Sequence, residues 1–168
     1  SIVTAPGPGE PAQVKTFRYD LYTPTETAKA RGATDEHSHD PAMTSQFDAY
    51  DPSYTGGVSL ATGWVAGAEG GAQSVITGQL GGDGTVRAWS TGSRLDGGPA
   101  MYLHSPEHHS AMTEFAQIAS FAPFPGGTAG VRVATSSTTT GADLIVSGMG
   151  PGGSHVRKYA LARADPAA

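Results

Sequence analysis

Short runs of alternating apolar and polar residues follow one another along the chain, and one pattern occurs three times. It consists of an apolar run, a glycine-rich turn, a valine, a basic residue, one spacer and an aromatic residue. The copies begin at Ile2, Val75 and Ile145, which are 73 and 70 residues apart. Self-similarity at a nearly regular period predicts a repeat protein.

A second pattern lies between these copies. The segment from Phe47 to Thr62 is similar to the one from Ile118 to Thr135, and both alternate apolar and polar positions as half-buried strands do. We name the strand GVSLAT or GVRVAT strand A, and the three strands that follow it in each repeat B, C and D. The strand order along the chain is then B, C, D, A, B, C, D, A, B, C. The sequence therefore predicts ten strands in one all-β repeat domain over residues 1–168, with strand repeats near residues 2–20, 47–92 and 118–162.

The composition agrees with many short strands. The chain of 168 residues has the length of about one domain, with 38% hydrophobic residues and a net charge of −5. Its 24 glycines and 12 prolines favour tight turns over helices. Lys and Arg are scattered, and no apolar run approaches the ~20 residues that span a bilayer. We therefore expect neither a nucleic-acid partner nor membrane insertion, and the absence of cysteine excludes disulfides.

Two strings make a resemblance to a known family specific. IVSGMGPGGSHVRKY, which begins at Ile145, and FDAYDPSYTGGVSLATG, which begins at Phe47, resemble the FG-GAP-like (VCBS-type) β-propeller repeats of secreted bacterial proteins. The resemblance covers most of the chain outside two insertions. It implies four-stranded antiparallel blades and an extracytoplasmic location, periplasmic or secreted. It implies no particular activity, because propellers host unrelated functions.

The chain departs from the family pattern in two ways. The family often has a calcium loop of alternating Asp and Asn between strands A and B, whereas the corresponding loops here contain only Glu69 and only Asp143 as acidic residues, so we expect no calcium. Propellers usually have at least about four blades, and ten strands make about two and a half. We therefore expect a partial β-propeller, or one completed by an oligomer. The partner is then another copy of the chain or another protein subunit.

Two insertions between strands C and D carry the candidate chemistry. They lie near residues 21–46 and 93–114, and both contain the sequence Ala-Met-Thr. Imidazole is the commonest protein ligand for zinc and copper, and a methionine thioether suits copper(I). A copper or zinc site is therefore one interpretation, with five histidines as candidate ligands: His37, His39, His104, His108 and His109.

The other interpretation is that these insertions are polar, partly solvated loops that are similar because they were duplicated. No HExxH or comparable motif joins the histidines. The sixth histidine, His155, occupies a strand-start position where the other repeats have Gln13 and Thr85, which indicates a structural role.

Two further recurring positions are interpreted structurally. The aromatic residues Phe17, Trp89 and Tyr159 recur at one strand position, which is typical of packing between blades. The basic residues Lys15, Arg87 and Arg157 alternate with apolar neighbours, which indicates a solvated strand face. The glycine-rich turns lack the Lys-Ser or Lys-Thr of a phosphate-binding loop.

These observations favour binding over catalysis. No nucleophile elbow, cysteine nucleophile or ordered pair of histidine and carboxylate is evident. The leading hypothesis is a non-catalytic extracytoplasmic binding or structural module that mediates protein–protein assembly. The alternatives are a copper- or zinc-binding protein and a carbohydrate-binding, lectin-like propeller.

Overall fold

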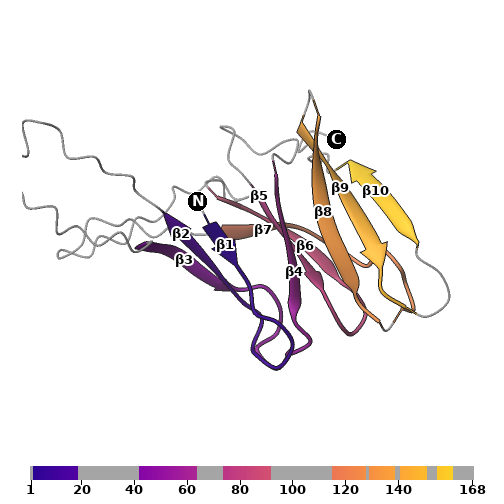
Figure 1. The fold of residues 1–168 in the computed structure, drawn as a ribbon, viewed down its shortest axis with the longest axis horizontal. Coiled ribbons are helices and arrows are strands. Elements are labelled where there is room, and N and C mark those ends of the chain that lie inside the picture. Colours follow the sequence, from indigo (N-terminus) through magenta and orange to yellow (C-terminus); the bar gives the residue numbers. More distant parts are fainter. Residues whose placement is uncertain are drawn as a thin grey trace, which may run out of the picture.

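The computed structural model describes residues 2–18, 42–63, 74–91, 115–127, 129–138, 141–150 and 155–160. Within these ranges the chain forms ten strands in three antiparallel sheets (Figure 1). The N-terminal sheet contains β1 (Ile2–Thr4), β2 (Gln13–Arg18) and β3 (Ala42–Asp48). The central sheet contains β4 (Val58–Gly63), β5 (Ser74–Gln79), β6 (Val86–Thr91) and β7 (Phe115–Phe121). The C-terminal sheet contains β8 (Val131–Thr138), β9 (Gly141–Gly148) and β10 (Val156–Ala160).

The predicted all-β class and strand order are confirmed. The N-terminal sheet holds strand types B, C and D, the central sheet A to D, and the C-terminal sheet A, B and C. Two boundaries differ: β3 begins at Ala42 and so includes the Ala-Met-Thr of the first insertion, and β7 begins at Phe115, a few residues before the predicted start near residue 118. No helix occurs within the described ranges, so none of them provides a helix long and apolar enough to cross a membrane.

The repeat extends to irregularities of the sheets. The pairing of β2 with β3 shifts register between Thr16 and Phe17, and the pairing of β6 with β7 shifts between Ala88 and Trp89. These are the same two positions of the repeat. A bulge bends and twists its strand locally, so the two sheets share the repeat position of this irregularity as well as the order of strands B, C and D.

The sheets pack face to face in chain order, with one apolar cluster at each junction (Figure 1). Between the N-terminal and central sheets, the Trp89 ring lies 4.7 Å from the Phe47 ring, measured between centroids. Between the central and C-terminal sheets, Tyr159 lies 4.9 Å from Phe121. The predicted packing role of the recurring aromatic position is therefore confirmed for Trp89 and Tyr159.

The A strands of neighbouring sheets also meet directly. The backbone N–H of Val133 in β8 donates to the hydroxyl of Ser59 in β4 at 3.1 Å, and the Thr135 hydroxyl donates to the Thr62 carbonyl at 2.7 Å. Next to this contact, Gly130 has a φ of +79°, and an added Cβ would lie 2.2 Å from the carbonyl carbon of Leu80. Only glycine allows this close approach of two backbones. The described strands thus form an open array of three sheets rather than a closed ring.

Candidate binding site formed by aromatic sockets

The five histidines predicted as metal ligands all lie outside the described residues, as does Glu69. The described part of the chain holds no group of three or more His, Cys, Asp or Glu side chains that could bind a metal ion. The metal site therefore remains a prediction. Asp143, which the sequence placed in the second A–B loop, lies in β9 and forms an ion pair with Lys158 in β10, at 2.6 Å.

The loop that leaves the N-terminal sheet inserts a tyrosine into the central sheet. Tyr50 is buried, and its hydroxyl donates to the carbonyl of Thr85 at 2.8 Å. The Arg87 guanidinium lies over the Tyr50 ring, 5.0 Å from its centroid, and Arg87 Nη1 donates to the carbonyl of Ala49 at 2.9 Å. A single basic side chain therefore binds both the ring and the adjacent backbone. We call this arrangement an aromatic socket.

Burial controls the ionisation of this socket. Loss of solvent on burial raises the pKa of Tyr50 well above its ordinary value of 10.0, and a hydrogen bond from Thr77 and the positive charge of Arg87 only partly oppose this effect. Tyr50 therefore stays a neutral hydrogen-bond donor at physiological pH. Next to it, the Tyr54 ring lies 5.3 Å from the Tyr50 ring, and the Tyr54 hydroxyl donates to the carbonyl of Gly57 at 3.0 Å. This contact ties the loop to itself.

The next loop makes an equivalent contact with the C-terminal sheet. Phe124 takes the place of Tyr50, and the Arg157 guanidinium lies 4.9 Å from the centroid of its ring. Arg157 Nη1 donates to the carbonyl of Pro123 at 2.6 Å. The ring of His155 lies 6.4 Å from the Phe124 ring, so this strand-start histidine contributes to a structural contact. The register of β9 with β10 differs by one residue from that of β5 with β6, and Gly148 therefore faces the ring.

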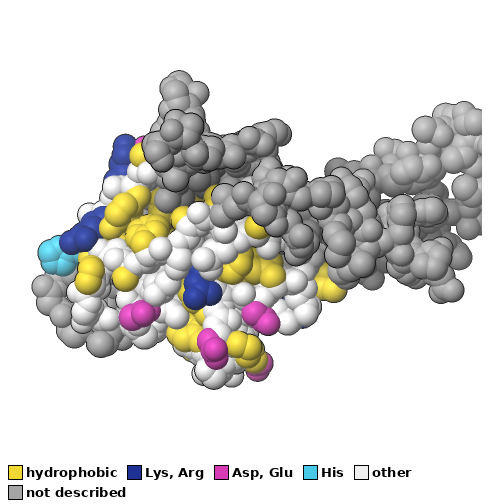
Figure 2. All heavy atoms as spheres, turned by 180° about the vertical axis from the view of Figure 1, so that it is seen from behind, with side chains coloured by type: hydrophobic (Ala, Val, Ile, Leu, Met, Phe, Trp, Pro, Cys, Tyr) yellow, Lys and Arg dark blue, Asp and Glu magenta, His cyan; other side chains and the backbone are white. Residues whose placement is uncertain are grey.

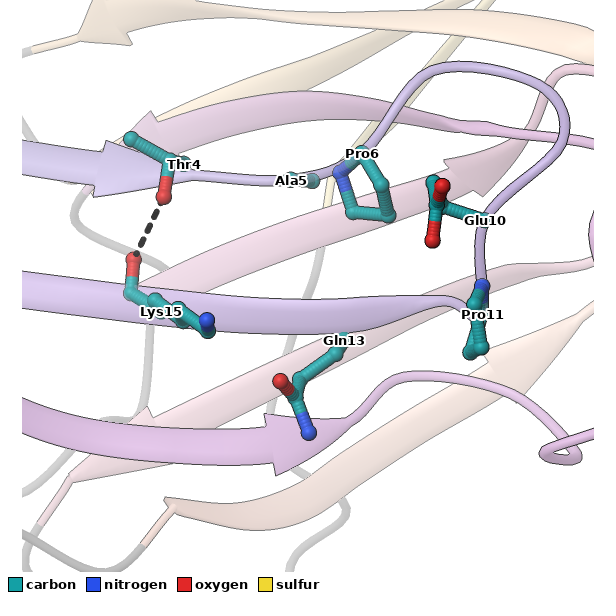
Figure 3. A pocket seen from close by; sticks show the side chains of 7 residues that line it. All are labelled: Thr4, Ala5, Pro6, Glu10, Pro11, Gln13 and Lys15. Atoms are coloured by element: carbon teal, nitrogen blue, oxygen red, sulfur yellow. Dashed lines mark hydrogen bonds between the residues drawn. The ribbon is translucent and has the colours of Figure 1, made fainter.

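The N-terminal sheet has the same positions, but no described loop fills them. Thr4 pairs with Lys15 as Thr77 pairs with Arg87, and in both pairs the threonine hydroxyl lies within 3.5 Å of the basic residue's carbonyl. Around Thr4 and Lys15 is an open depression of about 510 Å³ (Figure 3). Its lining contains no aromatic residue and consists of Thr4, Ala5, Pro6, Glu10, Pro11, Gln13 and Lys15.

The interpretation of the basic residues as a solvated strand face was wrong for Arg87, which is half-buried, whereas Arg157 is exposed as that interpretation expects. Each holds the carbonyl and the aromatic ring of the loop that enters its sheet. The sequence did contain a usable signal. The two loops carry Tyr50 and Phe124 at related positions, and each is followed by one of the recurring basic residues, but the partners are separated by 37 and 33 residues.

Comparison of the chain with protein-family models, with curated proteins and with solved structures finds no match. The sockets therefore rest on the repeat within this chain, which supplies two filled examples and one open counterpart.

Proposed function

We propose that the chain is a non-catalytic, extracytoplasmic assembly module built from β-propeller-type blades. Its two terminal sheets associate with further sheets of the same kind on other polypeptide chains, in the first instance other copies of itself. The support comes from the described strands of the two terminal sheets, which represent different parts of one four-strand repeat.

A valine that occurs in all three sheets carries this proposal. Val14 and Val86 are both 0% exposed, whereas Val156 at the same repeat position is 63% exposed. Val14 pairs with Phe47 and Val86 with Phe121 on the D strands, but no described strand pairs with the outer edge of β10. Burial of a valine side chain contributes roughly 1.5–3 kcal/mol, so the exposed copy favours association.

The opposite end of the stack shows the same effect. Ile2 in β1 is 47% exposed, whereas Val75, its counterpart in β5, is 3% exposed. In the central sheet an A strand pairs with β5, but no described strand pairs with the corresponding edge of β1. An unpaired strand edge presents backbone groups that bind another strand. Figure 2 shows hydrophobic and basic side chains together on the surface at the end formed by the C-terminal sheet.

Native mass spectrometry of the untagged chain over a range of concentrations tests the proposal. We expect masses at multiples of the chain mass, and we expect Val156→Lys to shift the population towards the monomer because it replaces an exposed apolar side chain with a charged one. Ser120→Lys, at an exposed position on β7 of the central sheet, is the matched control and should leave the assembly unchanged. A monomer at every concentration would contradict the proposal.

A further inference from the structure

We propose that the depression around Thr4, Gln13 and Lys15 is an empty aromatic socket. It receives an aromatic side chain from a loop of another polypeptide chain, and the strand that follows this loop pairs with β1. This inference rests on the assembly function proposed above and specifies the partner segment. The partner is recognised by its chemistry: an aromatic residue preceded by alanine or proline, then glycines, then an apolar A-type strand.

The filled socket of the central sheet is the template for this assignment. Tyr50 lies among Thr77, Thr85 and Arg87, whose repeat counterparts in the N-terminal sheet are Thr4, Gln13 and Lys15. All three counterparts line the depression. The register between the B and C strands is also the same, because Thr4 pairs with Lys15 as Thr77 pairs with Arg87. Position, residue chemistry and register therefore agree.

The face around the empty socket continues the same correspondence. Ile2 pairs with Phe17 as Val75 pairs with Trp89. In the central sheet this face is covered, and the Trp89 ring packs at a tilt against Phe47 of the preceding sheet. In the N-terminal sheet, Ile2 is exposed and Phe17 is only half-buried. The apolar residues beside the socket are thus those that a preceding sheet covers elsewhere in the chain.

One continuous segment accounts for both the socket and the free strand edge. After Tyr50 the chain runs directly into β4, which pairs with β5 from Val58–Gln79 to Gly63–Ser74. After Phe124 it runs in the same way into β8, which pairs with β9. Each loop therefore fills the socket of a sheet and then adds the A strand to that sheet. The N-terminal sheet lacks both, since no described loop fills its socket and no described strand covers that edge of β1.

The occupant comes from outside the described residues of this molecule. The two described loops of this class are already engaged, Tyr50 with the central sheet and Phe124 with the C-terminal sheet. A second copy of the chain has the same two loops engaged, so at this end the occupant belongs to another protein subunit that carries a loop of this kind. Lys15 also changes the binding chemistry. A lysine ammonium attracts an aromatic face as a point charge, whereas an arginine stacks on it and holds the adjacent carbonyl with its planar fork. The empty socket is therefore weaker than the filled ones, which suits an exchangeable contact.

The test uses a fluorescent peptide with the sequence of residues 46–63, which contains Phe47, Tyr50 and the whole of β4. We expect one-to-one binding to the intact chain and slower hydrogen exchange of the amides of residues 2–5. Lys15→Ala should weaken binding about fivefold or more, and Lys15→Arg should strengthen it, because cation–π contacts have this magnitude and favour arginine. Replacement of the peptide's Tyr50 by Ala should weaken binding similarly, whereas Arg132→Ala on the exposed face of β8 should not.

A fusion covers the case in which the free peptide binds too weakly to detect. The same segment is joined to the N-terminus by a short flexible linker, which gives a millimolar effective concentration. We expect a higher midpoint of thermal unfolding than for a fusion whose added segment carries Ala in place of tyrosine. If neither peptide nor fusion distinguishes tyrosine from alanine, or Lys15 from its variants, the socket assignment is wrong.

Failure of the socket assignment can be distinguished from failure of the assembly proposal. Self-association without any effect of the peptide or of Lys15 overturns the socket and leaves the assembly function. A monomer that binds the peptide in a Lys15-dependent manner overturns self-association and leaves the socket.

Discussion

The central sheet and the two terminal sheets are built from one repeat, yet they bury it to different extents. In the central sheet, each face is covered by a neighbour, and Arg87 is committed to the loop that enters the sheet. In the N-terminal sheet, the equivalent Lys15 borders an open depression, and in the C-terminal sheet the equivalent of Val86 is exposed. The environment of a repeat residue therefore depends on the position of its sheet in the stack, not on its own strand.

The largest expected effect on stability comes from the valine that occurs at the same repeat position in all three sheets. Val86→Ala should lower the free energy of unfolding by about 2 kcal/mol, because it removes two methyl groups from a fully buried site and leaves a cavity. Val156→Ala should change it by less than about 0.5 kcal/mol in the monomer. Urea denaturation of both variants measures the difference. Equal effects would mean that the two sheets are not distinguished by burial.

The basic position should show a smaller contrast. Arg87→Ala should cost about 1.5 kcal/mol, because it removes a charged hydrogen bond to Ala49 and the cation over Tyr50. Lys15→Ala should leave the stability of the isolated chain within about 0.5 kcal/mol. The same denaturation curves measure both. A destabilised Lys15→Ala chain would show that its socket is already filled within the molecule.

The smallest expected effect is a dependence of stability on alkaline pH. Because burial raises the pKa of Tyr50 in the folded chain, unfolded chains lose this proton first, and the stability from the neutral tyrosine is complete below its ordinary pKa of 10.0. Between pH 10 and 11 the loss should reach about 1 kcal/mol. Tyr50→Phe should remove that part of the slope in unfolding curves measured from pH 8 to 11. An unchanged slope would contradict a buried, neutral Tyr50.

Much of the fold could be predicted because its signals are local. Each strand is indicated by period-two alternation and by a glycine-rich turn that lies within about twenty residues of it. Because the pattern is repeated, strands that a single copy would not identify with certainty are recognised by comparison with the other copies. The start of β3 was missed for a local reason as well. Its first residues, Ala42 and Met43 followed by Thr44 and Ser45, do not alternate apolar and polar positions, and their strand character appears only in pairing, where the Thr44 hydroxyl lies 2.9 Å from that of Thr16.

The sockets could not be predicted in the same way. Alternation shows that Arg87 lies on one face of its strand, but not what covers that face. The covering residue, Tyr50, lies in a loop 37 residues earlier and reaches Arg87 only because two whole sheets pack against each other. In the absence of that packing, a basic residue between apolar neighbours has the same pattern as a solvated one.

The unlike ends of the stack have a geometric consequence. Among the described strands, one terminal sheet ends in a B strand and the other in a C strand, so the stack has a direction, and joining one end to the other gives a heterologous contact. Repetition of such a contact closes a ring when the rotations add up to a full turn, and otherwise extends a filament. The angle between neighbouring sheets, which the filled sockets and the close approach at Gly130 help to fix, therefore also determines whether growth ends.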